Sequence, residues 1–332
     1  MLARKIRGVL GALSLFAVVA TPAGAQAEDP AKFPSKTVRL IVPSAPGGPV
    51  DSVARILADA LRTVWSETIV IENKPGAGNS TGALQVANAP PDGYTMLVIS
   101  DSITVIPSLY PDFAKDPLKQ FAPVTMLVTA PQVLVARADL PASDLRAFIA
   151  YGKANPGKLN IASPGAGTIS HLTQVLLQQR TGIKSSHIPF RGAAPAVNAL
   201  LGKHVDASWL MPAPLLSAIE SGQLKALAVT SAGRYPKLLN VATAEELGVK
   251  DFQVMNLQGL FAPAGTPKPI VDKIAGVVGK LLQKPEVKER LAQIGFDALG
   301  DGPDAAAELV RVNVARWSEV VAAAGIKPAG VK

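Results

Sequence analysis

The sequence predicts an α/β protein of two lobes, and three observations predict it. The chain has 332 residues, of which 48% are hydrophobic, so it is long enough for two domains with substantial cores. Short runs rich in Val and Ile alternate with longer amphipathic stretches, which is the pattern of helices packed on largely parallel sheets. Two apolar extended segments, 122–135 and 224–230, are suited to carry the chain between lobes. Two connecting strands make a hinge with a cleft beside it, and such clefts commonly hold small ligands.

The first 27 residues predict a secretory signal peptide. Three basic side chains within residues 4–7 precede an apolar run over residues 8–20, and Ala25 and Ala27 place small side chains at the cleavage positions. A membrane anchor is the less favoured alternative, because a spanning helix needs roughly 20 apolar residues. A secreted chain without cysteine indicates the bacterial periplasm. Nucleotides and nicotinamide cofactors are not normally supplied in that compartment.

The composition excludes several chemistries. The chain has no cysteine, which rules out disulfides, thiolate metal sites and a cysteine nucleophile. Its three histidines, His171, His187 and His204, show no metal-ligand spacing, so we expect neither a metal nor another cofactor. The net charge of +8 comes without a block of basic residues or an aromatic ladder, so nucleic acid is not an expected partner. We expect a monomer that binds a small molecule.

The predicted elements follow the alternation along the chain. In the first lobe, strands are expected at 37–43, 68–72 and 94–99, with helices at 50–64 and 80–89. Further on, strands are expected near 133–136, 159–162, 185–188, 205–209 and 224–229, with helices near 143–154, 169–180, 194–201 and 214–221. A last strand at 252–261 precedes helices near 267–283, 285–294 and 303–324, which should pack back onto the first sheet. The predicted lobes are therefore 28–127 with 229–332 for lobe 1, and 128–228 for an inserted lobe 2.

A glycine-rich turn between the first strand and the first helix predicts an anion site. Its residues are Ser44, Ala45, Pro46, Gly47 and Gly48, with Asp51 in the helix that follows. Such a turn presents backbone N–H groups at the positive end of a helix dipole, and glycine lets an anion approach the backbone. The alternative is a tight structural connection in which Asp51 satisfies the donors of the first helical turn. The turn alone does not separate the two interpretations.

A second turn of this kind lies in the inserted lobe. It runs from a strand to a helix start through Ser163, Gly165, Ala166, Gly167 and Thr168 to His171. A third, at residues 75–82, precedes a helix in the first lobe. None is a P-loop or a complete dinucleotide-binding fingerprint. Two anion-ready turns, one in each lobe, favour a clamp on the two ends of one small anionic ligand.

An envelope hydrolase acting on a carboxylate or ester is the alternative function. The nucleophile elbow Gly-x-Ser-x-Gly is absent, and Ser170 with His171 is the least implausible nucleophile and base. No carboxylate is evident to orient that histidine, so capping or ligand contact is the favoured role. The acids that stand at turns or helix starts are explained by capping: Asp92, Asp101, Asp206 and Glu220. We therefore expect a binding protein and not an enzyme.

Short segments along the chain resemble a known family. The segments are 34–43, 46–51, 71–78, 91–95, 107–110, 154–159, 189–192, 227–231 and 260–267. Each is short, but together they keep their order and spacing from about residue 33 to residue 326. The sequence resembles the Bug, or TctC-like, solute-binding proteins of tripartite tricarboxylate transporters.

The resemblance implies a type II periplasmic binding protein fold with a ligand cleft between its lobes. It implies a receptor that closes on a small carboxylate and delivers it to membrane transporter subunits or to a sensor domain. It also implies that the ligand meets the turn at 44–48, the loop Ser100, Asp101 and Ser102, and the turn at 163–168. The same comparison adds the turn Phe190, Arg191 and Gly192, and the stretch near Trp209.

The sequence departs from the family pattern at positions that bear on the ligand. Ile103 and Ile106 replace a histidine and an asparagine of the family, and Trp209 leads an apolar stretch. We therefore predict an aromatic or branched carboxylate before citrate, with stacking on Trp209. The alternative is that these apolar side chains point into the lobe cores. Asp101 either pairs with a ligand ammonium or, as the favoured alternative, caps the helix that follows it.

Overall fold

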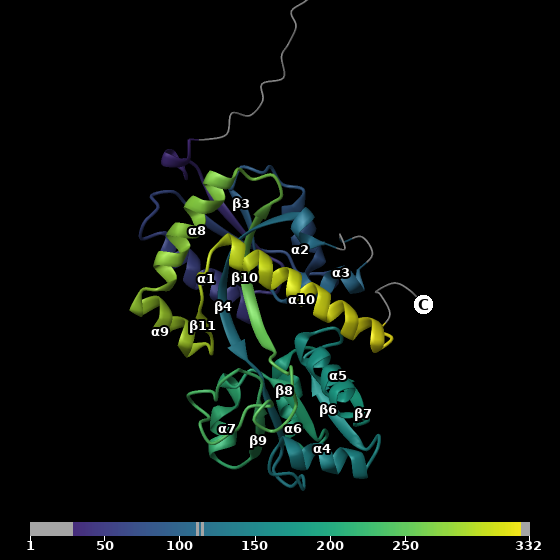
Figure 1. Ribbon diagram of the computed structural model, residues 1–332. Coiled ribbons are helices and arrows are strands. Elements are labelled where there is room, and N and C mark those ends of the chain that lie inside the picture. Colours follow the sequence, from purple (N-terminus) through teal and green to yellow (C-terminus); the bar gives the residue numbers. More distant parts are fainter. Residues whose placement is uncertain (1–28, 111–112, 114–115, 327–332) are drawn as a thin grey trace, which may run out of the picture.

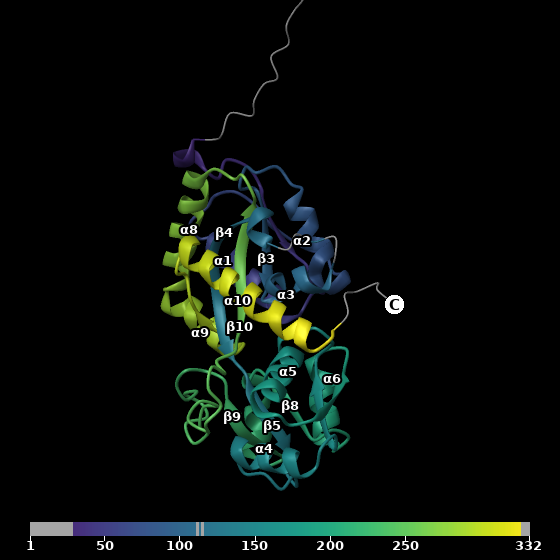
Figure 2. The same ribbon diagram turned by 45° about the vertical axis from the view of Figure 1, so that its right-hand side comes forward.

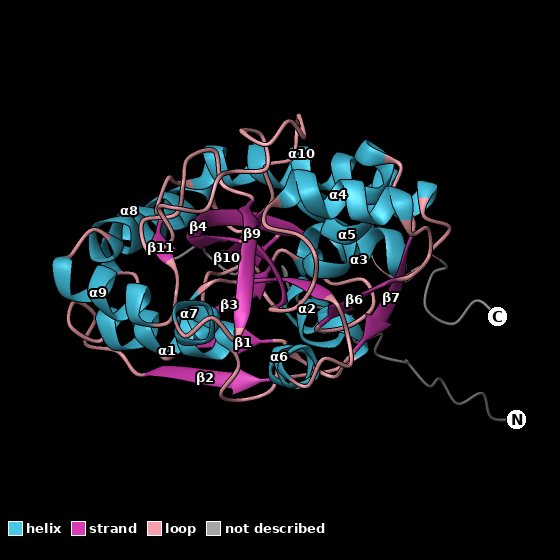
Figure 3. Ribbon diagram, turned by 90° about the horizontal axis from the view of Figure 1, so that it is seen from below, coloured by secondary structure: helices cyan, strands magenta, loops and turns pink. Residues whose placement is uncertain are grey.

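The computed structural model describes residues 29–110, 113 and 116–326, and it has two lobes joined by long strands (Figure 1). Lobe 1 contains a six-stranded sheet of order β11-β4-β10-β3-β1-β2, and lobe 2 a five-stranded sheet of order β7-β6-β8-β5-β9. The predicted two-lobed α/β architecture is confirmed. Seen from below, β2 and β7 lie at outer edges while helices surround the inner strands (Figure 3). The predicted signal peptide lies outside the described residues.

Lobe 1 begins with a parallel unit whose loops meet at one edge. Its elements are β1 (Val38–Val42), α1 (Pro49–Leu61), β2 (Ile69–Asn73), α2 (Ser80–Ala87), β3 (Thr95–Ser100), α3 (Ser102–Leu109), β4 (Phe121–Pro131), β10 (Met255–Pro263), α8 (Lys268–Leu282), α9 (Pro285–Gln293) and β11 (Asp297–Ala298). β1 pairs with β2 and β3 in parallel, so their carboxyl ends share an edge. β10 is antiparallel to both β3 and β4, which makes the sheet mixed where the sequence predicted a largely parallel one. Loops at such an edge commonly hold ligands.

Lobe 2 repeats this arrangement on a smaller sheet. Its elements are β5 (Val133–Arg137), α4 (Leu145–Ala154), β6 (Leu159–Ser163), α5 (Ile169–Thr181), β7 (Ser185–Pro189), α6 (Ala193–Leu201), β8 (Ala207–Leu210), α7 (Leu216–Glu220) and β9 (Leu224–Val229). β6 is parallel to β7 and β8, whereas β5 is antiparallel to β8 and β9. α5 is capped at its N-terminus by Thr168, whose side chain accepts the His171 N–H, and at its C-terminus by Gly182 in the left-handed conformation. The cleft loop between β6 and α5 is therefore held at both ends by regular structure.

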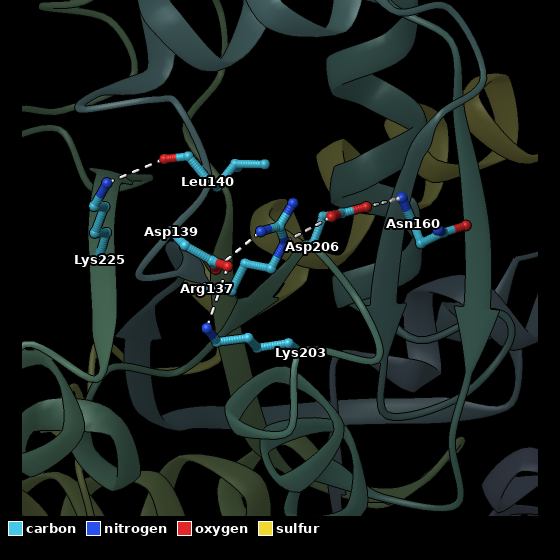
Figure 4. Close-up of polar contacts among 7 residues, drawn as sticks. All are labelled: Arg137, Asp139, Leu140, Asn160, Lys203, Asp206 and Lys225. Atoms are coloured by element: carbon cyan, nitrogen blue, oxygen red, sulfur yellow. Dashed lines mark hydrogen bonds and ion pairs between the residues drawn. The ribbon is translucent and has the colours of Figure 1, made fainter.

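A polar network fastens the strands of lobe 2 on the side shown in Figure 4. Arg137 Nε donates to Asp206 Oδ1 at 2.9 Å, and the other oxygen of Asp206 accepts the Asn160 N–H at 2.8 Å. Arg137 also pairs with Asp139, whose carboxylate meets Lys203 as well. Hydrogen bonds from these two cations lower the pKa of Asp139 to about 2. Asp206 thus joins β5 to β6, a structural role in place of the helix or turn cap that its position suggested.

The lobe boundaries differ from those predicted at 127/128 and 228/229. β4 stays in the lobe 1 sheet as far as Pro131, so the first crossing falls at Gln132. After β9, residues 230–254 remain with lobe 2: Val229 bridges to Thr243, and Phe252 belongs to the lobe 2 core. The return crossing therefore comes just before β10. The sequence placed it too early because residues 230–254 contain no regular strand or helix to mark the lobe to which they belong.

The last helix, α10 (Pro303–Ala323), spans both lobes and does not pack on the first sheet alone. Ala306 and Val310 lie in a core cluster of lobe 1, whereas Trp317 and Val320 lie in the main core cluster of lobe 2. Figures 1 and 2 show α10 crossing the long strands and ending beside α5. The assignment of residues 229–332 to lobe 1 is therefore corrected here as well: α10 is a third connection across the hinge.

Candidate functional site

A cavity of about 360 Å³ opens between the lobes, within the size range of small-molecule sites. Lobe 1 contributes the loop after β3, the inner face of α3, the turn before α2 and one residue of β10. Lobe 2 contributes the loop between β6 and α5. The lining residues are Gly78, Asn79, Ser100, Asp101, Ser102, Val105, Ile106, Leu109, Tyr110, Pro164, Ala166, Gly167, Thr168, Ile169, Ser170 and Asn256. Six of the predicted site residues are thus brought together: Ser100, Asp101, Ser102, Ala166, Gly167 and Thr168.

The lobe 1 side carries a chain of hydroxyl and amide groups. Asn79 Nδ2 donates to Ser102 Oγ at 3.0 Å, and the Ser100 hydroxyl donates to the same oxygen at 3.0 Å. The Ser102 oxygen therefore accepts twice, and a hydroxyl has one further proton to donate. Among the described residues no acceptor for that proton is found, so the Ser102 hydroxyl can donate to a ligand oxygen.

Asp101 lies beside this chain, where α3 meets β10. Its N–H donates to the Leu257 carbonyl at 2.8 Å, and its carboxyl accepts the Leu257 N–H at 3.3 Å. The side chain makes no capping hydrogen bond to α3, which corrects the favoured interpretation of Asp101 as a cap. Burial raises the pKa of this carboxyl to about 7, against the smaller opposite effect of contacts with Leu257, Ser100 and Ser102. Part of the residue stays accessible from the cavity.

The lobe 2 side presents the N-terminus of α5. Thr168 closes the loop: its hydroxyl donates to the Gly165 carbonyl at 2.8 Å and accepts the His171 N–H. The next two N–H groups, of Ile169 and Ser170, stand at the first helical positions, where no intrahelical acceptor exists. Both residues line the cavity, so these donors and the positive end of the helix dipole are directed at a ligand.

Two histidines, His171 and His187, contact the loop between β6 and α5 without lining the cavity. The rings of His171 and His187 stack with centroids 3.7 Å apart, and His171 Nδ1 accepts the Gly167 N–H at 3.1 Å. Ser163 Oγ lies 2.6 Å from His187 Nε2 but is fully buried and does not line the cavity. Burial lowers the pKa of both imidazoles, to about 4 for His187, where His171 adds to the effect. These neutral rings hold the loop, and nothing in their contacts favours the Ser170–His171 pair of the hydrolase alternative.

The apolar wall of the cavity comes from α3 and not from Trp209. The predicted stacking of a ligand on Trp209 is wrong: this side chain is 0% exposed and packs on Phe252, with ring centroids 5.5 Å apart, in the lobe 2 core. Val105, Ile106 and Leu109 line the cavity instead, with Ile169 from the opposite lobe. Ile106 lines the cavity, whereas Ile103 lines a smaller neighbouring one. That either replaces a polar ligand contact of the family stays a prediction.

The first glycine turn does not line the cavity. Asp51 is 1% exposed and accepts hydrogen bonds from Gly47 N, from Arg55 and from Asn73, so it takes up a backbone donor that the anion interpretation left for the ligand. The predicted contact of Asp51 with a ligand is therefore corrected to a structural role. The turn lies at the carboxyl end of β1, on the same sheet edge as the loops that line the cavity. A ligand contact by residues 44–48 stays a prediction.

The turn Phe190, Arg191 and Gly192 lies next to the cleft loop. Phe190 N donates to the Ser163 carbonyl and Gly192 N to the Pro164 carbonyl, each at 2.9 Å. None of the three residues lines the cavity, and the Phe190 side chain packs against a core cluster of lobe 2. Their observed role is to hold the loop in position, and direct ligand contact by them stays a prediction.

Three polar lining residues were missed from the sequence: Asn79, Tyr110 and Asn256. Asn79 belongs to the third glycine turn, where Ala77 and Asn79 both have positive φ, and that unusual turn was the available signal. Tyr110 stands at the end of α3, beside a segment that the sequence analysis assigned to the cleft. Asn256 is on β10, and only the antiparallel pairing of β10 with β3 brings it to the cavity. No local pattern predicts that pairing partner.

No group of three or more His, Cys, Asp or Glu side chains with the geometry of a metal site occurs among the described residues. No helix in the described ranges has the length and apolar character needed to cross a bilayer.

The fold and the cleft define a class of protein: a two-lobed binding protein with a solute site between its lobes. Residues 53–326 match the model of the tripartite tricarboxylate transporter family receptor, and the chain belongs to this family of periplasmic solute-binding proteins. The resemblance found in the sequence is thereby confirmed.

Individual relatives agree with this assignment. The chain is 34% identical over 310 residues to a UPF0065 protein from the tcbD-tcbE intergenic region of Pseudomonas sp. (strain P51), covering 93% of this chain and 92% of the relative. The periplasmic binding protein BugD is 39% identical with a TM-score of 0.74, covering 89% of this chain and all of BugD. MatC of Rhodopseudomonas palustris, solved with malate, is 36% identical with a TM-score of 0.73, covering 87% and 100%. Rpa4515 of R. palustris, solved with adipate, is 30% identical with a TM-score of 0.77, covering 89% and 99%.

Proposed function

We propose that this chain captures a small organic carboxylate in the interlobe cleft and delivers it to a membrane transporter or a sensor. One observation carries the proposal: the free N–H groups of Ile169 and Ser170, at the N-terminus of α5, and the free hydroxyl proton of Ser102 line one cavity from opposite lobes. Such donors suit carboxylate oxygens. The adipate in Rpa4515 and the malate in MatC support a carboxylate as the ligand class.

We propose further that the ligand has an apolar body, aromatic or branched, and that it leaves the site unchanged. The α3 wall of Val105, Ile106 and Leu109 supports such a body, because polar ligand groups placed against it would lose hydrogen bonds to water without replacement. The family consists of binding proteins, which supports capture without turnover. We expect the receptor to act as a monomer.

A thermal-shift panel tests the proposed ligand class. Mature protein is mixed with 4-methylpentanoate, benzoate, malate, adipate and citrate, and with the neutral amide 4-methylpentanamide as the matched control for the first acid. We expect the melting temperature to rise with 4-methylpentanoate or benzoate and to rise less with the amide, because only the carboxylate brings a negative charge to the donors and the dipole of α5. Chromatography of the recovered acid should show it unchanged. An amide that stabilises as strongly as its acid, or citrate as the sole active compound, would contradict the proposal.

We also expect export with cleavage after Ala27, because Ala25 and Ala27 provide the small side chains that signal peptidase requires. N-terminal sequencing of the periplasmic fraction should begin at Glu28. Replacing Ala27 by aspartate should leave an uncleaved precursor, which serves as the matched control. A wild-type chain that remains uncleaved in the membrane fraction would refute both the leader and the periplasmic location of the mature protein.

A further inference from the structure

The cavity has an unusual charge pattern. Among the described residues that line it, none is Lys, Arg or His, and the ionisable groups are Asp101 and Tyr110. The lobe 2 end is electropositive through the N-terminus of α5, which carries no compensating acidic side chain in its first turn. The lobe 1 end carries the Asp101 carboxyl. A ligand that spans the cavity therefore meets backbone donors at the lobe 2 end and, at the lobe 1 end, an acid beside the Ser102 hydroxyl.

Contacts with Leu257 fix the position of Asp101, but its carboxyl has no charged partner among the described residues. The Leu257 contacts fix it between α3 and β10, and a cavity of about 10 Å³ lies on its other side, lined by Ser100, Leu257 and Phe261 among others. Besides this contact with the backbone of β10, the cavity that Asp101 lines is formed by hydroxyls of β3 and α3, Asn79, Tyr110, Asn256 and the lobe 2 loop 164–170. No described cation lies among them. The carboxyl thus lacks a charged partner although it lines a ligand cavity.

On the basis of the carboxylate function proposed above, we propose that Asp101 selects ligands that carry a protonated amine in addition to their carboxylate. The ligand carboxylate lies at the N-terminus of α5, and the ammonium group donates to Asp101. A salt-bridged pair inside a cleft gains from the low local dielectric, provided that both charges are partnered. An amino acid with an apolar side chain combines this charge pattern with the α3 wall.

The same residue discriminates against a second ligand carboxylate. A dianion would place like charges together at the lobe 1 end, with no lining cation to offset them, and specificity often rests on such repulsion. Because the pKa of Asp101 is about 7, the preference between the two kinds of ligand changes with pH near neutrality. A ligand ammonium lowers this pKa and binds better as Asp101 ionises, so its affinity rises between about pH 6 and pH 8. A carboxylate at the same place would behave in the opposite way.

Calorimetry with matched ligand pairs tests this assignment. Leucine and 4-methylpentanoate differ by one ammonium group, as do 6-aminohexanoate and hexanoate. At pH 8 we expect wild-type protein to bind the amine-bearing member of at least one pair about tenfold or more tightly, the effect of one charge-assisted hydrogen bond. Asp101→Asn keeps the size and an acceptor for Leu257 N–H, and it should remove or reverse that preference. Asp301→Asn, which removes an exposed charge of lobe 1, should leave it unchanged.

The outcomes separate this inference from the proposed function. Equal affinity within both pairs, or a preference that persists in Asp101→Asn, refutes the role of Asp101 while carboxylate capture stands. If no acid of either pair and none of the thermal-shift panel binds, the proposed function fails and this inference falls with it. The wild-type pH series needs no variant: an amine preference that grows from pH 6 to pH 8 supports the assignment, and one that shrinks refutes it.

Discussion

Replacing Gly167 by alanine is expected to weaken ligand binding at least about tenfold while lobe 2 stays folded. Gly167 has φ +75°, and a Cβ built there would lie 2.6 Å from Leu109 Cδ1 on the opposite lobe. Leu109 is packed against a core cluster on one side and lines the cavity on the other, so its side chain can make room only by moving into the cavity. The new methyl group therefore either pushes apart the two walls that must hold the ligand or drives Leu109 into the ligand's space. Calorimetry with the best acid of the thermal-shift panel measures the loss.

Gly157→Ala is the matched control for this variant. Gly157 also lies in lobe 2 with φ +77°, but a Cβ there would meet no atom within 4 Å. Both variants carry the same backbone strain, of about 1–2 kcal/mol, and should lose similar thermal stability. Only Gly167→Ala should lose affinity. If both bind like the wild type, the contact between Gly167 and Leu109 is not part of the ligand-bound state.

The α/β architecture was predictable because its strands and helices follow from local sequence patterns of apolar residues and helix-start residues. Buried strands such as β3, with Met96 to Ile99 all inaccessible to solvent, read as continuous apolar runs, and α1 begins with proline at its first position. Of the two extended segments expected to cross the hinge, 122–135 does so, whereas 224–230 stays within the lobe 2 sheet as β9. Local sequence patterns do not predict the lobe on which an irregular segment packs. Residues 230–254 and the second half of α10 were therefore assigned to the wrong lobe.

The candidate site divides in the same way. Thr168 and the loop 164–170 were predictable, because strand-to-helix turns concentrate free donors whatever the rest of the fold does, whereas Ser102 was expected from the family resemblance alone. Asp51 and Trp209 were not predictable, because their roles depend on direction. Asp51 turns inward to Asn73 of β2, and Trp209, one residue from the end of β8, points into the core. At the end of a short strand the alternation of faces is too brief to read from the sequence.

Removing the Asp51 carboxylate is expected to destabilise the fold by about 2–4 kcal/mol, because a buried acceptor is lost from three hydrogen bonds, one of them from a charged arginine. Its oxygens accept from Gly47 N at 2.9 Å, from Asn73 Nδ2 at 3.0 Å and from Arg55 Nε at 2.8 Å, and the side chain is almost fully buried. Asp51→Ala therefore releases the first glycine turn as well as destabilising α1. Urea unfolding of the mature chain at pH 7 measures the cost.

Asp59→Ala is the control on the same helix. Asp59 also meets two arginines, Arg62 and Arg290, but its side chain is 48% exposed, so its loss should cost less than about 1 kcal/mol. Equal costs for the two variants would show that Asp51 is no more than a surface ion pair.

The pH dependence of the Asp51→Ala effect follows from the pKa of the carboxyl. Burial alone would raise that pKa, but hydrogen bonds from Arg55, Gly47 and Asn73 outweigh burial and hold it below the ordinary value of 3.8. A carboxyl with a lowered folded-state pKa contributes stability above its unfolded-state pKa and loses it as pH falls through the folded-state value. The difference between wild type and Asp51→Ala should therefore be constant from about pH 7 to pH 5 and shrink below about pH 4. A difference that grows in acid would mean that the folded-state pKa of Asp51 is raised and not lowered, and the anchoring of the turn by its charge would be refuted.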